Sequence, residues 1–154
     1  IIYFQNNMII YHEKDKNDIY QIITVPKYFD CNYYISNSIH SELTIDDFIY
    51  DPKSKVGKIV SNIKIGTVRI ITGEISNQNP DNLEVNIPTG SVGARGTEFV
   101  VVTESDKKST VVLLGPGENN SLGMVPGILN ISDGVNIVNV TTPGFQSVVF
   151  KWES

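Results

Sequence analysis

The sequence predicts an all-β fold of short strands with little or no helix. Segments rich in β-branched and aromatic residues recur along the chain, for example at 19–25, 42–50, 57–73 and 83–88. Glycine or proline interrupts these segments about every ten residues, and no segment keeps helical spacing of its apolar residues over three turns. This spacing is typical of a sandwich, a barrel or a β-solenoid.

The segment 57–73 predicts a strand that changes its buried face. Its odd-numbered apolar positions from Ile59 to Ile65 share one face, and the even-numbered positions from Val68 to Thr72 then take over. Gly66 lies between the two sets, so we expect it to mark a turn or a change of face. Alternation in the same way places the apolar residues of 83–87 on one face.

Two further segments predict connections. The apolar runs 97–104 and 109–115 flank the polar stretch Ser105–Lys108, which predicts a hairpin with a polar tip. Residues 74–82 form a polar stretch with a proline, for which we expect a loop with a short helical turn at most.

The length and the net charge of the chain argue against several classes of function. With 154 residues the chain predicts a single domain, 1–154, and its formal net charge of −5 argues against nucleic-acid binding and against an electrostatic membrane anchor. No apolar run reaches the roughly 18 residues that a membrane span needs. Because the sequence begins in the middle of a strand-like pattern, we expect a fragment or a mature form.

The sequence has few residues that could bind a metal ion or act as a cysteine nucleophile. Cys31 is the single cysteine, and His12 and His40 are the two histidines. Zinc needs three or four ligands at suitable spacing, and a cysteine nucleophile needs a nearby base. We therefore expect no metal site, no cofactor and no cysteine nucleophile, and we interpret Cys31 as a small apolar residue.

The acidic cluster Asp46, Asp47 and Asp51 leaves one enzymatic alternative open. It lacks the glycine and the closing glutamate of a calcium loop. We interpret these aspartates as solvated turn residues. The alternative is a polysaccharide-active enzyme in which Asp46, Asp47 and Glu98 form carboxylate pairs.

A glycine-rich corner lies at 90–102, GSVGARGTEFVVV. It contains Arg95, and the chain has one other arginine, Arg69. The corner does not match a phosphate-binding loop, which needs G-x-x-x-x-G-K and a following helix, and it does not match the G-x-S-x-G nucleophile elbow, because Ser91 directly follows Gly90. An anion nest of backbone N–H groups stays an alternative. The planar guanidinium of Arg95 has several donors, so we expect it to fix the corner by binding carbonyls or Glu98. The alternative is that Arg95 binds a carboxylate of a partner.

The run IPTGSVGARGTEFVVV resembles the signature of the FecR domain family. The preceding segment, with IDDFIYDP, GTVRIITG and NPDN, is similar to one branch of that family, and STVVLLGPG and VNVTTPGFQSVV are similar to its closing strands. The likeness covers 41–149, whereas residues 1–30 match only as generic strands. The motif residues are Asp47, Phe48, Tyr50, Asp51, Pro52, Gly93, Arg95, Gly96, Thr97, Glu98 and Phe99.

The resemblance implies a β-solenoid-like or flattened β-sandwich domain, without enzymatic activity, in the periplasm or outside the cell. It also implies a protein partner, such as the signalling domain of a TonB-dependent receptor or a sigma-regulator system of iron-siderophore uptake. This sequence contains no membrane helix and no anti-sigma segment of the family's kind, so we expect either that those parts were removed or that this is an exported member without them. The D-F-x-Y-D-P pattern favours the second. The alternative is a structural β-scaffold in a surface protein.

Overall fold

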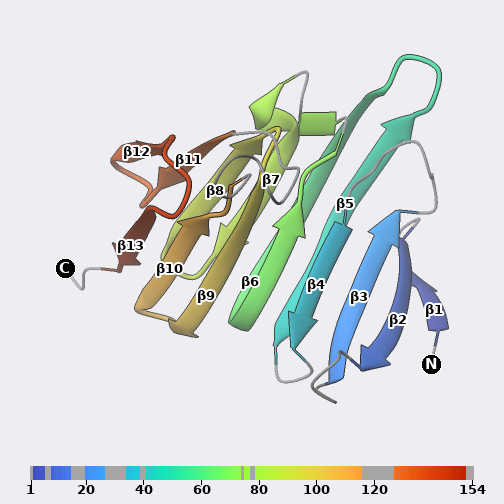
Figure 1. Ribbon diagram of the computed structural model, residues 1–154, viewed down its shortest axis with the longest axis horizontal. Coiled ribbons are helices and arrows are strands. Elements are labelled where there is room, and N and C mark those ends of the chain that lie inside the picture. The colour runs from blue at the N-terminus through green and yellow to red at the C-terminus, as the bar shows by residue number, and fades with distance from the viewer. Residues whose placement is uncertain are drawn as a thin grey trace.

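The computed structural model of the chain confirms the all-β class. It describes residues 2–5, 8–14, 20–26, 34–38, 41–73, 75–76, 79–115 and 127–151. The strands are β1 (Ile2–Gln5), β2 (Met8–Lys14), β3 (Tyr20–Pro26), β4 (Tyr34–Ser38), β5 (Glu42–Asp51), β6 (Val56–Ile71), β7 (Leu83–Ile87), β8 (Gly90–Arg95), β9 (Glu98–Ser105), β10 (Lys108–Leu113), β11 (Ile128–Ser132), β12 (Ile137–Val140) and β13 (Gln146–Phe150); a 3-10 turn, η2 (Pro80–Asn82), precedes β7 (Figure 1).

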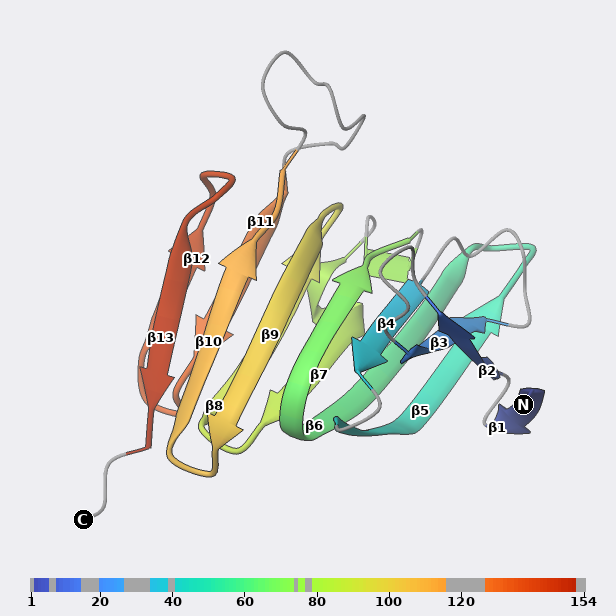
Figure 2. The same cartoon turned by 60° about the horizontal axis from the view of Figure 1, so that its bottom comes forward.

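The strands form two sheets that share β6. Sheet A runs β1-β2-β3-β4-β6-β9-β10-β13, and sheet B runs β5-β6-β7-β8-β11-β12. From β7 onward the chain adds two strands to sheet B, two to sheet A, two to sheet B and one to sheet A. Figure 2 shows the two sheets facing each other along this part. Of the two expected architectures, this is the flattened sandwich.

Gly66 is the point at which β6 passes from one sheet to the other, as its position predicts. Residues before it pair with β5 and β7 in sheet B, and residues after it pair with β4 and β9 in sheet A. The backbone of Gly66 has φ +103, a conformation that other residues rarely adopt. The buried positions change from odd to even numbers across it, from Ile63 to Val68.

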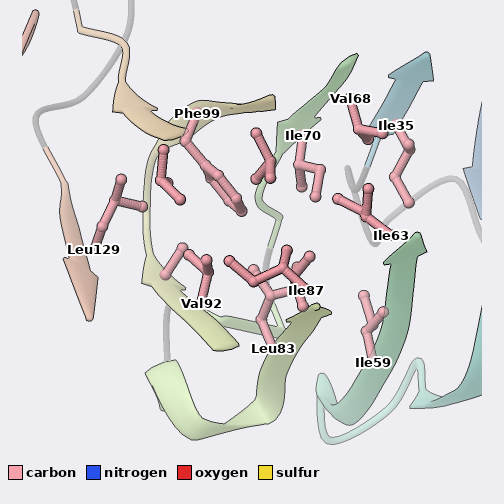
Figure 3. Close-up of a cluster of buried hydrophobic side chains, with 14 of the residues drawn as sticks. Ile35, Ile59, Ile63, Val68, Ile70, Leu83, Ile87, Val92, Phe99 and Leu129 are labelled. Atoms are coloured by element: carbon pink, nitrogen blue, oxygen red, sulfur yellow. The ribbon is translucent and has the colours of Figure 1, made fainter. Parts of the chain in front are cut away.

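The core fills the space between the sheets (Figure 3). Phe99, Ile70 and Val68 of sheet A face Leu83 and the buried residues beside it in sheet B. These four named residues are each at most 1 % exposed. Alternation along β7 buries its three apolar residues, as expected. These contacts join the sheets because each contributes one apolar face to a common layer.

The predicted connections also agree with the structure. The polar stretch 105–108 contains the tight β9–β10 turn, and the stretch 74–82 contains η2. One prediction was wrong: Ile65 does not share the buried face and is 45 % exposed. The register between β5 and β6 shifts there, so that Glu42 pairs with Ile65 and Leu43 with Ile63. The extra residue turns Ile65 outward.

Candidate functional site

The glycine-rich corner between β8 and β9 is held by two threonines. Gly96 adopts φ +58, which turns the chain from sheet B into sheet A. The Thr97 amide donates to Thr72 Oγ1 at 2.7 Å, and the Thr72 amide and hydroxyl both donate to the Thr97 carbonyl at 2.9 and 2.8 Å. Phe99 then enters the core with no exposed surface. The motif residues Gly96, Thr97 and Phe99 therefore stabilise the turn between the two sheets and the start of β9.

Arg95 does not bind Glu98, contrary to the expectation from sequence. The Arg69 Nε donates to the Glu98 carboxylate instead. The reason is strand order, because β6 and β9 are neighbours in sheet A. Glu98 pairs with Ile71, and Arg69 lies two residues from Ile71 on the same strand. Arg95 ends β8, where its backbone pairs with Ile128, and its exposed side chain makes no hydrogen bond or ion pair with the described residues.

The D-F-x-Y-D-P motif ends β5 and starts its turn. Phe48 and Tyr50 are buried, at 5 and 7 % exposure, and Asp47 is half-buried. The Asp51 carboxylate accepts bonds from Ser54 Oγ at 2.7 Å and from the Lys53 amide at 3.0 Å. These bonds, that from Ser54 first, lower the pKa of Asp51 below its usual value. Pro52 occupies the same turn.

The carboxylates of the enzymatic alternative are divided between the sheets, since Asp46 and Asp47 lie on β5 of sheet B and Glu98 lies on sheet A. Asp46 lies on β5 of sheet B, where it accepts hydrogen bonds from Asn62 and Thr44. Glu98 is 3 % exposed and begins β9 of sheet A. Within the described ranges, no three acidic, histidine or cysteine side chains gather as metal ligands would. Cys31, His40 and the side chain of His12 lie outside those residues.

A hollow of about 400 Å³ lies on the outer face of sheet B, and we call it the polar groove. It crosses β7, β8, β11 and β12 beside η2. Glu84, Gly93, Asn130 and Asn139 form one row across its floor, since each is the register partner of the next. Asp81 of η2 also lines the groove, and η2 lies against β8, with the Pro80 carbonyl beside Gly93.

The second row of the polar groove contains Ser91, Ser132 and Ile137, which are again partners on β8, β11 and β12. Ile137 is 71 % exposed. The lining thus changes from acidic at Glu84 of β7, through hydroxyls and an amide on β8 and β11, to Asn139 and the exposed Ile137 on β12. Among the described lining residues none is basic and none is aromatic.

A second hollow, of about 220 Å³, lies where the two sheets end, between β12 and β13. Ile131 and Val149 of the core line it with Val138, Val148 and Phe150, and Asp133, Asn136 and Ser147 form its polar side. Val138 lies on the core side of β12, opposite Ile131, but is 51 % exposed. We call this surface, formed by Ile131, Val138, Val148 and Val149, the open end.

The two outer strands of sheet B differ in charge. β5, which pairs with β6 alone among the described strands, has the sequence ELTIDDFIYD with four acidic residues. β12, which pairs with β11 alone among them, has the sequence IVNV with none. Charged residues keep exposed strand edges from pairing with other chains. The β5 edge has this protection, and the β12 edge does not.

No family model matches the chain, and no curated protein is similar to it. In the described part of the chain no helix is long and apolar enough to cross a membrane. The polar groove and the open end were both missed by the sequence reasoning. Their signals in the sequence are the amides of Asn130 and Asn139 at alternate, outward positions and the uncharged strand 137–140.

Proposed function

We propose that the chain is a non-enzymatic, FecR-like extracytoplasmic module that binds another protein. Its role is sensing or regulation, related to the sigma-factor regulators of iron-siderophore uptake. The place of action is the periplasm or the cell exterior. The motif resemblance supports the family and the compartment, and the open end supports protein binding.

The observation that carries the proposal is the exposure of core-facing residues at the open end. Val138 points to the core side yet is half exposed, and the hollow beside it reaches the buried Ile131 and Val149. Each square ångström of apolar surface covered by a partner contributes about 25 cal/mol. A surface of this kind next to an uncharged strand edge favours association.

The occupant is an extended strand of the partner. A strand added to a sheet edge gains backbone hydrogen bonds, and its alternate side chains enter the neighbouring hollows. Here the backbone of β12 offers the edge, and the hollow of about 220 Å³ receives an apolar side chain against Val138 and Val149. The acidic edge of β5 resists such pairing.

Photocrosslinking in the native host tests the proposal. A photoreactive amino acid replaces Val138 at the open end or, as a matched control, Ile49, which is 60 % exposed on β5. We expect position 138 to crosslink a defined extracytoplasmic protein, identified by mass spectrometry, and position 49 to crosslink none. Equal crosslinking at both positions, or none at 138, would contradict the proposal.

A structural scaffold is the second candidate. The alternate addition of strands to the two sheets from β7 to β13 ends at the open end, and further strands of the same kind would prolong the sandwich. In that case the species crosslinked at Val138 is a β-rich segment of a larger surface protein or another copy of the chain. A separate receptor or sigma-regulator protein identifies the regulatory module instead.

A further inference from the structure

We infer that the polar groove on sheet B binds an extended peptide segment with a basic residue and, about four residues along, an apolar one. This site differs from the open end: Ile137 lines the groove, whereas the side chain of Val138 lies on the opposite face of β12. The inference therefore stands apart from the proposed function.

The charges of the lining determine the sign of the ligand. Asp81 and Glu84 are the charged residues among those described in the groove, and both are acidic. Neither carboxylate has an ion pair within the described part of the chain. An anionic ligand is repelled there, while a lysine or arginine side chain finds an opposite charge.

The middle of the groove suits a peptide backbone. The side chains of Asn130 and Asn139 make no hydrogen bond to any described residue. An asparagine amide offers both an acceptor and donors, so it can bind the N–H and the C=O groups of a passing peptide. Sugar rings commonly stack on aromatic residues, and the described lining has none.

The row sets the length of the segment. Glu84, Gly93, Asn130 and Asn139 lie on four adjacent strands, which are about 4.8 Å apart, so the row spans about 14 Å. An extended chain covers this distance with about four residues. A basic side chain at Glu84 therefore places the side chain four residues on above Asn139, where it lies beside Ile137, the neighbouring outward residue of β12.

Gly93 lines the polar groove without a side chain and so leaves space for a ligand. A Cβ at this position would have its nearest described neighbours, the carbonyl oxygens of Leu83 and Pro80, at 3.6 Å, and its backbone is not left-handed. Alanine therefore fits the fold at this position and fills part of the groove. Gly93→Ala thus separates binding from folding.

A titration series with synthetic peptides tests the inference. Acetylated, amidated peptides of Ser and Thr contain one Lys and one Leu, separated by one to five residues, and binding to the whole chain is measured by calorimetry. We expect the tightest binding with three intervening residues, and about threefold to fivefold weaker binding when Glu replaces Lys. A profile that is flat with spacing, or equal affinity for the Glu peptides, would overturn the inference.

Variants locate the binding. Glu84→Gln and Gly93→Ala should each weaken the Lys–Leu peptide at least threefold without changing the melting temperature. Asn130→Ala should weaken it likewise, whereas Asn86→Ala, a matched outward asparagine of β7 that does not line the groove, should not. Unchanged binding in the first three variants, or binding of a chito-oligosaccharide in place of every peptide, would overturn the inference.

Discussion

Removing the guanidinium of Arg69 should destabilise the fold far more than removing that of Arg95. The Glu98 side chain is 3 % exposed, and its ion pair in the structure is with Arg69. Arg69→Ala leaves this buried carboxylate without its cation. Arg95→Ala removes an exposed side chain that binds no described residue, so the two arginines of the chain form a matched pair.

The magnitude follows from the unequal burial of the two partners. Exposed ion pairs contribute about 0 to 1 kcal/mol, whereas removing one partner of a fully buried pair costs about 3 to 5 kcal/mol. Because Arg69 is 47 % exposed while Glu98 is buried, we expect an intermediate cost of about 2 kcal/mol. For a domain of this length that lowers the melting temperature by about 4 to 8 °C.

Urea and thermal unfolding of both variants measure the difference. Arg95→Ala should stay within about 0.5 kcal/mol of the parent. Adding Glu98→Gln to Arg69→Ala should recover part of the loss, because the buried group is then neutral. Equal losses in the two alanine variants, or a further loss on adding Glu98→Gln, would refute the reasoning.

Three other changes probe the core, the sheet crossover and a turn. Phe99→Ala should cost about 3 to 5 kcal/mol in urea unfolding, because it empties a fully buried site; a cost below 1 kcal/mol would contradict the packing. Gly66→Ala should cost about 1 to 3 kcal/mol, since its φ is +103 and the new Cβ would stand 2.2 Å from Ser41 Oγ; a melting temperature like that of the parent would contradict this. Hydrogen bonds lower the pKa of Asp133 below its ordinary 3.8, and the bond from the Asn136 amide has the largest effect. The stabilisation of the turn by this carboxylate is therefore complete above pH 3.8 and is lost as the pH falls through the lower pKa of the folded state. The exchange protection of the Val135 amide, which donates to Asp133 at 2.8 Å, should fall as Asp133 becomes protonated. Protection that stays constant while NMR of the Asp133 carboxyl carbon shows its protonation would contradict the assignment.

The sequence predicted those parts of the fold that local patterns determine. Alternation identified the strands, the change of parity at Gly66 identified the crossover between the sheets, and the polar stretch at 105–108 identified a hairpin. Each of these depends on neighbouring residues, because a strand buries alternate positions. The exposure of Ile65 could not be predicted, since it depends on a register shift against β5.

The pairing of Glu98 shows why side-chain partners were harder to predict. Arg95 is three residues away in sequence, but it ends β8 in sheet B before the corner at Gly96. Arg69 is 29 residues away and lies on the neighbouring strand of sheet A. Strand order determines such contacts, and a single sequence does not show strand order. The polar groove was missed for the same reason, because its rows join four strands.

The central claim is that the open end binds a partner strand, and the affinity for the crosslinked protein tests it most directly. The purified partner is titrated against the parent chain, Val138→Lys and the control Ile49→Lys, after melting curves have shown that all three are folded. A lysine at Val138 removes the apolar surface against which the partner's side chain packs and fills the hollow with a longer, charged side chain, so we predict at least tenfold weaker binding, while Ile49→Lys stays within twofold of the parent. Equal affinity of the Val138→Lys chain and the parent would contradict the claim.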